Sequence, residues 1–222
     1  MEISQQVNSG NTKKCLYGLK ISIFIVHNEN IHDLLTKNNA ISLQISKLVD
    51  NETGKHFTRI NDLSDVSLKN FNDYKTTLNQ ALQNRKILEN NMKITDLKKK
   101  SNLIISFTLS KKEVSSESSR VTFEKSQNIS QLDFAELTST DYGLDINMVD
   151  QHDYFATTTV DNFRSLSTNL ECIALNKNPK FDSNLTLALK KTLNVSSQIL
   201  FINCVHSNED PPTESYNSLK VY

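Results

Sequence analysis

The sequence predicts an α/β domain with a central sheet and flanking helices. Buried strands alternate with amphipathic helices along the chain, which is typical of this class. Residues 19–26 (LKISIFIV) and 103–109 (LIISFTL) are short, nearly continuous apolar runs rich in β-branched side chains, so each predicts a buried strand. The similar run at 197–205 (SQILFINCV) predicts a last buried strand.

Two segments have apolar residues at every third or fourth position and predict the main helices. The first runs from about residue 68 to residue 82, with Asp65 or Ser67 as its cap. The second covers residues 160–173. Ser183 or Asn184 is expected to cap a short third helix that runs to residue 193.

The connecting segments predict turns, one hairpin and a loop. Residues 25–35 (IVHNENIHDLL) indicate a strand, then a polar turn that enters a short helix. Alternating residues at 41–49, a turn, and a short strand at 56–60 predict a hairpin. The low-complexity stretch 111–119 (KKEVSSESS) predicts a mobile loop. Further strand segments are expected at residues 121–124 and 129–134.

The composition argues against several classes of function. The 25 basic residues balance the 25 acidic ones, so no global field attracts nucleic acid or a membrane. Only four glycines occur among 222 residues, about 2% where roughly 7% is usual. Loops that bind phosphate need glycine, so a nucleotide-dependent enzyme is disfavoured. Three widely spaced cysteines and five histidines without metal-ligand spacing predict reduced thiols and neither a metal nor a cofactor.

Three segments, in this order, resemble the second half of a kinesin motor head. Residues 25–35 are similar to the kinesin pattern V-E-I-Y-N-E-x-I-x-D-L-L. The helix at 160–175 followed by 178–193 (NPKFDSNLTLALKKTL) resembles the relay helix and the V-P-Y-R-N-S-K-L-T segment after it. Residues 197–222 are similar to the closing strand and helix. The resemblance covers about residues 15–222 and implies a P-loop NTPase-like mixed sheet that lacks the N-terminal P-loop part.

The resemblance implies that switch I is degenerate. Active kinesins have N-x-x-S-S-R-S-H, which places hydroxyls and an arginine on the γ-phosphate and magnesium. The matching stretch here is 95–102 (TDLKKKSN). Ser101 keeps its residue type, whereas Lys100 replaces the arginine and Asn102 replaces the histidine. The P-loop pattern G-x-x-x-x-G-K-[ST] occurs nowhere in the chain.

Switch II is degenerate as well. Its kinesin pattern D-L-A-G-S-E matches 133–138 (DFAELT), which begins at Asp133 and ends at Thr138. Glu136 takes the position of the glycine whose N–H senses the γ-phosphate. A carboxylate there would repel a phosphate in a poorly screened pocket. We therefore expect no enzymatic activity.

Among kinesins, the chain is most similar to the motor-homology domain of the non-catalytic kinesin-14 subunits of budding yeasts (the Vik/Cik type). That resemblance implies a C-terminal head at residues 1–222 with an upstream coiled coil. It also implies a catalytic kinesin-14 subunit as heterodimer partner and microtubules as the ligand. The implied sites of action are the nucleus, the spindle pole body and spindle microtubules, in spindle function or nuclear fusion during mating.

Kinesins contact tubulin through the relay helix, the loop after it and the next helix. Basic residues in these segments, and on the hairpin that also touches tubulin, are our candidates for microtubule binding: Arg164, Lys177, Lys180, Lys190, Lys191, Lys55 and Arg59. Tubulin is acidic, so a basic patch would provide steering and salt-sensitive affinity. The simpler interpretation of the same lysines is an ordinary solvated surface.

Three other interpretations remain open. The chain fits a module that docks on a partner kinesin without touching the filament. It also fits a divergent ATP-hydrolysing kinesin whose P-loop was removed, although Glu136 argues against this. Ser101, His27 and Asp133 superficially offer a hydrolase triad, but the sequence contains no nucleophile elbow.

Overall fold

A computed structural model describes residues 14–37, 39–49, 56–94, 97–98, 100–117, 120–123, 127–138 and 154–202. Strands and helices alternate only in part, because the first five strands all precede the first helix. In chain order the elements are β1 (Lys14–His27), β2 (Asn30–Asp33), β3 (Ile45–Val49), β4 (His56–Ile60), β5 (Val66–Leu68), α1 (Phe71–Met92), β6 (Asn102–Glu117), β7 (Arg120–Phe123), β8 (Gln127–Glu136), α2 (Tyr154–Ala174) and α3 (Asn184–Ala188).

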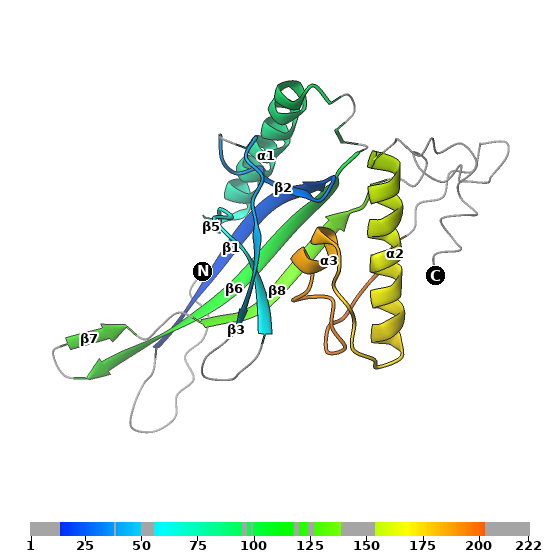
Figure 1. Ribbon diagram of the computed structural model, residues 1–222. Helices are drawn as coiled ribbons and strands as arrows, with labels where there is room; N and C mark the ends of the chain where they lie inside the picture. Colours follow the sequence, from blue (N-terminus) through cyan, green and yellow to red (C-terminus); the bar gives the residue numbers. More distant parts are fainter. Residues whose placement is uncertain are drawn as a thin grey trace.

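One sheet organises the molecule, with helices on both faces (Figure 1). β6 lies at its centre and pairs with β1 on one side and β8 on the other. β1 also pairs with β2 and β5, while β7 pairs with the far end of β6. Every pairing among the described strands is antiparallel, so within this part of the chain the expected mixed sheet is corrected to an antiparallel one. β3 and β4 form the predicted hairpin.

The segment after β1 is a hairpin, and the short helix predicted there was wrong. β2 pairs with β1 from His27 opposite Asn30 onward. The two turn residues, Asn28 and Glu29, have φ values of 46° and 59°, as a two-residue hairpin turn of type I′ requires. All side chains from residue 31 to residue 34 are buried, so no alternation in the sequence distinguished a strand from a helix.

α1 starts later and ends later than the sequence predicted. Its N-cap is Asn70, whose side chain accepts from the backbone N–H groups of Asn72 and Asp73 at 2.9 and 3.0 Å. The proposed cap Asp65 forms an ion pair with Lys20 instead, at 2.8 Å. The other proposed cap, Ser67, lies in β5. In the described ranges, no helix has both the length and the hydropathy needed to cross a membrane.

Residues 111–117, which we expected in a loop, form the second half of β6. Residues 120–123 pair with them as β7, and the two strands extend away from the body as an arm (Figure 1). Residues 118 and 119 lie outside the described residues. The serines and lysines of this stretch suggested disorder, but backbone pairing with β1 and β7 fixes a strand whatever the side chains are.

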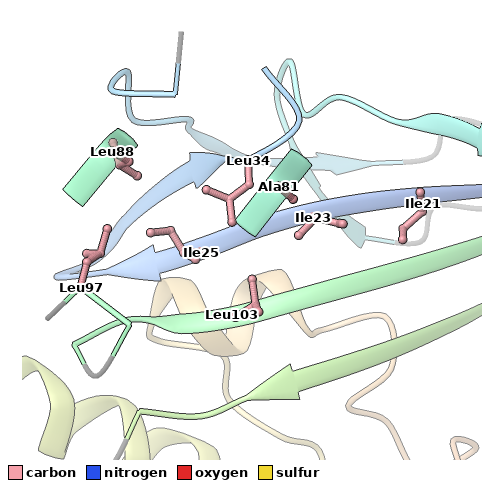
Figure 2. Packing of buried hydrophobic residues seen from close by; sticks show 8 residues of the cluster. All are labelled: Ile21, Ile23, Ile25, Leu34, Ala81, Leu88, Leu97 and Leu103. Carbon is pink, nitrogen blue, oxygen red and sulfur yellow. The ribbon is translucent and has the colours of Figure 1, made fainter. Parts of the chain in front are cut away.

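The sheet has two apolar layers, one on each face. Ile21, Ile23 and Ile25 of β1 pack against Ala81 and Leu88 of α1 (Figure 2). Alternate residues of β1 point to the opposite face and pack against α2 and the segment around α3; the members of this second cluster include Phe24, Val26, Ile104, Leu166, Leu185 and Leu189. Burial on both faces explains why residues 21–26 of β1 are almost entirely apolar.

The structure describes only residues 197–202 of the last predicted strand, and no strand forms there. Residues 198–202 have no strand partner, and Leu200 and Ile202 are 83% and 73% exposed. Residues 203–222, with the rest of that strand and the closing helix, lie outside the described residues. An apolar run predicts strand propensity, but a strand forms only where a neighbouring strand offers its backbone groups. The capping prediction for α3 is confirmed: Ser183 and Thr186 form a capping box.

Two buried histidines make the stability of the fold depend on pH. His27 Nδ1 donates to the carbonyl oxygen of Lys100 at 2.7 Å, and His32 Nδ1 donates to that of Asn39 at 2.9 Å. Burial lowers the pKa of both rings below the usual 6.5. His32 Nε2 has no hydrogen-bond partner among the described residues, so a proton there would find no acceptor.

We predict that the free energy of unfolding falls as the pH is lowered through about 6.5. The unfolded chain takes up protons on these histidines at a higher pH than the folded chain does, so acid favours unfolding. Urea denaturation between pH 8 and pH 5 measures this dependence. His32→Gln should flatten the slope, and an unchanged slope in both His32→Gln and His27→Gln would contradict the prediction.

Candidate functional site

The two switch segments predicted from the sequence lie together at one end of the sheet. The backbone N–H of Thr138, just after β8, donates to Asn102 Oδ1 at the start of β6, at 2.9 Å. Both residues are buried. Of the switch I match, residues 95, 96 and 99 lie outside the described residues. The remaining contacts show switch I and switch II residues bonded directly to each other.

Arg85 of α1 lies at the centre of this region, and sequence reasoning missed it. Its side chain is 6% exposed. One terminal nitrogen, Nη2, donates to the carbonyl oxygens of Lys98 and Ser101 at 3.0 and 3.2 Å, and to Ser101 Oγ at 2.9 Å. The other, Nη1, lies 3.6 Å from Glu136 Oε2. Arg85 thus connects α1, the switch I segment and the end of β8.

The surroundings of Arg85 show which of these contacts dominate. Burial lowers the pKa of Arg85, and the Glu136 carboxylate partly offsets that shift. The Glu136 side chain is 53% exposed, and 3.6 Å is long for an ion pair, so water screens this attraction. The carbonyl oxygens of Lys98 and Ser101 are closer. The hydrogen bonds to switch I therefore contribute more than the ion pair does.

The hydroxyl of Ser101, the residue that keeps the switch I type, is used within the protein. It donates to the carbonyl oxygen of Leu97 at 2.6 Å while it accepts from Arg85. The carbonyl of Lys100 accepts from His27. In an active kinesin, groups at these positions would face magnesium and phosphate. Here they bond to α1 and β1.

Asp133 of switch II is bonded to the opposite face of the sheet. It accepts from Thr192 Oγ1, in the segment after α3, at 2.7 Å. Its other neighbour is the amide of Gln131. Ser101, His27 and Asp133 are thus each bonded to a different structural partner, and the arrangement does not support a hydrolase triad. Among the described residues, no group of three or more His, Cys, Asp or Glu side chains is placed to hold a metal ion.

The candidate microtubule-binding residues around α3 form a basic surface. Lys177, Lys180 and Lys191 are exposed, and Lys190 Nζ lies 5.6 Å from the centre of the Phe181 ring. The single acidic residue between Lys177 and Lys191 is Asp182, which accepts a hydrogen bond from Ser165 of α2. Four lysines against one carboxylate leave this segment with an excess of positive charge.

The two other described candidates, Arg164 and Arg59, lie on α2 and β4 rather than in the segment around α3. Arg164 on α2 is exposed, and its Nη1 lies 3.0 Å from Asp161 Oδ1. This ion pair leaves less of its positive charge available to attract tubulin. Arg59 is exposed on β4, and the neighbouring Thr58 donates to the carbonyl of Leu187 at 3.2 Å, so the hairpin lies against α3. Lys55 lies outside the described residues.

The contacts of Arg85 predict an asymmetry between two substitutions. Arg85→Met should lower the free energy of unfolding by about 2–4 kcal/mol, because it leaves buried carbonyl groups without donors. Glu136→Gln should cost less than about 1 kcal/mol, because the ion pair is long and solvated. Urea denaturation of both variants measures the difference. Equal losses would show that the ion pair, rather than the hydrogen bonds to switch I, stabilises the region.

Comparisons with known proteins identify the fold. The sequence model of the kinesin motor domain matches residues 1–221. A search of curated proteins gives no match. One similar solved structure is the C-terminal motor and motor homology domain of Kar3Vik1 fused to a synthetic heterodimeric coiled coil, at 19% identity and a TM-score of 0.67, over 93% of this chain and 51% of that chain.

A second similar structure comes from crystal structures of mutants that reveal a signalling pathway for activation of the kinesin motor ATPase. It matches with 19% identity and a TM-score of 0.64, over 93% of this chain and 56% of that chain. The chain therefore spans about half the length of each matched structure. The fold is that of a kinesin motor, as the sequence predicted, and because the family model covers nearly every residue, the chain belongs to the kinesin motor domain family.

Proposed function

We propose that this chain is a catalytically inert kinesin-like head that binds microtubules independently of nucleotide. It would act as the non-motor subunit of a kinesin-14 heterodimer. The observation that supports inertness most strongly is the Arg85 cluster, because protein groups already bond the switch residues that nucleotide would have to engage. The proposed partner is supported by the similarity to the solved Kar3Vik1 structure, which contains a motor and a motor homology domain fused to a synthetic heterodimeric coiled coil.

Arg85 replaces a switch contact with a permanent one. In the family pattern, a switch I arginine pairs with a switch II acid when nucleotide is bound. Here Lys100 occupies the arginine position, and a guanidinium from α1 reaches both Ser101 and Glu136. These contacts already engage the groups that an active kinesin would use to respond to a γ-phosphate. Nucleotide-independent behaviour follows from this arrangement.

The basic surface around α3 supports microtubule binding. Lys177, Lys180, Lys190 and Lys191 project from one segment, while Asp182, their acidic neighbour, is bonded to Ser165. The chain as a whole has no net charge. The positive potential of this surface therefore comes from its own lysines and not from an overall positive charge. Contact with tubulin places the protein on the cytoskeleton. Work at the spindle, the spindle pole body or in nuclear fusion belongs to the same proposal.

Reversing the four lysine charges tests the filament contact. The quadruple variant Lys177→Glu, Lys180→Glu, Lys190→Glu and Lys191→Glu should weaken microtubule binding by about tenfold or more at low salt, because its surface would repel acidic tubulin. Co-sedimentation with ATP, ADP or AMP-PNP measures the affinity, which should be the same with all three nucleotides for the unchanged chain.

A matched control reverses four exposed lysines on the α1 side of the molecule: Lys37, Lys69, Lys75 and Lys86. This control should bind microtubules as the unchanged chain does. Equal binding by both quadruple variants would favour the alternative of a partner-docking module without filament contact. Binding that changes between ATP and ADP would favour a divergent ATPase instead.

A further inference from the structure

The short helix α3 is held in place by contacts from other elements. It spans five residues, fewer than an isolated helix needs to be stable in water. Its capping box links Ser183 and Thr186, which leaves the backbone N–H of Asn184 without a partner inside the helix. That N–H donates instead to Oε2 of Glu29 at 2.6 Å, a carboxylate 155 residues earlier in the chain. The first turn of α3 is therefore completed by the turn between β1 and β2.

Glu29 accepts a second hydrogen bond from the same residue. Its backbone carbonyl oxygen accepts from the side-chain amide of Asn184, Nδ2, at 2.5 Å. Both residues are half-buried, so water competes with these bonds less than it would on an open surface. A backbone N–H that donates to a carboxylate also forms one of the stronger kinds of hydrogen bond. Two bonds between the same two residues fix the direction of α3 as well as its distance from the sheet.

The turn that carries Glu29 is held from its other side. Asn28 and Glu29 have left-handed φ values of 46° and 59°, and the buried ring of His27, just before them, bonds to the carbonyl oxygen of Lys100 at 2.7 Å. A left-handed φ is unfavourable for a glutamate, and glycine, asparagine or aspartate is the usual choice in such a turn. Local backbone preference therefore does not account for a glutamate here, whereas the bond from its carboxylate to Asn184 does.

The position of α3 decides how the proposed filament surface is arranged. Lys177 and Lys180 come before α3 in the chain, and Lys190 and Lys191 follow it. The four charges form one surface only while α3 keeps the two pairs at a fixed spacing. By charge alone, a carboxylate beside this basic segment should weaken binding to acidic tubulin. The hydrogen bonds of Glu29 to α3 predict the opposite effect, so the two explanations differ in sign.

We propose that Glu29 is a positioning residue for the filament contact. It holds the first turn of α3 against the β1–β2 turn and thereby keeps the two lysine pairs in the arrangement that fits the acidic surface of tubulin. Removing its side chain should weaken binding even though a negative charge is lost. The inference rests on the proposed function and adds to it a residue from a different element of the fold.

Glu29→Gly tests the proposal. Glycine adopts a φ of 59° readily, so this variant loses the carboxylate without straining the turn. In the full-length protein, hydrogen–deuterium exchange at residues 184–189 should become faster by about tenfold or more. Microtubule affinity at low salt should fall by about threefold to tenfold, because binding must then also order α3. Glu29→Gln keeps an acceptor oxygen without the charge and should recover most of this loss.

Asp62→Gly is the matched control. Asp62 is an exposed carboxylate in the turn after β4, its φ is 57°, and among the described residues it forms no hydrogen bond to Asn184. The variant therefore removes the same charge from the same backbone conformation without touching α3. It should bind microtubules as the unchanged protein does. Urea denaturation curves confirm that each variant is folded.

Three results would overturn this inference while the unchanged protein still binds microtubules. They are binding by Glu29→Gly that equals or exceeds that of the unchanged protein, exchange in α3 that stays the same in this variant, and an equal loss of affinity in Asp62→Gly. Absence of binding by the unchanged protein would overturn the proposed function, and this inference with it. The two failures are thus distinguished by the unchanged protein alone.

Discussion

The guanidinium of Arg85 is the interaction on which the switch region depends. It is a buried charge whose Nη2 donates to two carbonyl oxygens and one hydroxyl, while its Nε has no partner among the described residues. These hydrogen bonds hold the segment before β6 against α1, and the longer ion pair with Glu136 adds a weaker link to the end of β8. Under the proposed function, a region that has two arrangements in a nucleotide-driven motor is stabilised in one.

The same sheet also anchors the surface that we propose binds microtubules. The side chain of Asp133 points from β8 to the other face of the sheet, where it accepts a hydrogen bond from Thr192, just beyond α3. At the far end of β1, the carboxylate and carbonyl of Glu29 accept from the backbone N–H and the side-chain amide of Asn184 at the start of α3. α3 is thus anchored to the sheet at both ends. These contacts position the segment that carries the lysines proposed to bind microtubules.

Much of the fold was predictable because its central strands are buried on both faces. The runs at the centres of β1 and β6 are nearly continuously apolar, as strands buried on both faces require. The switch segments were predicted by resemblance, and the structure brings one residue of each predicted segment, Asn102 and Thr138, together. The cap of α1 was mistaken because Asp65, Ser67 and Asn70 are all competent caps within six residues, and only tertiary pairing of β5 with β1 decides among them.

Other features depend on contacts that no local pattern contains. Arg85 stands in the apolar stripe formed by Ala81 and Leu88, where a charged residue is an exception that signals a buried partner. The sequence contained that signal, but it did not show which groups would bond to Arg85. The run 197–202 has the composition of a strand, yet strand formation requires a paired neighbour, and no described strand pairs with this run.

The central claim is that protein contacts have replaced nucleotide in the switch region. Titration of the intact protein with a fluorescent ATP or ADP analogue in the presence of magnesium tests it most directly. We predict no saturable signal, with identical results for the unchanged protein and for Glu136→Gln. Saturable, magnesium-dependent binding that competes with unlabelled ATP would contradict the account.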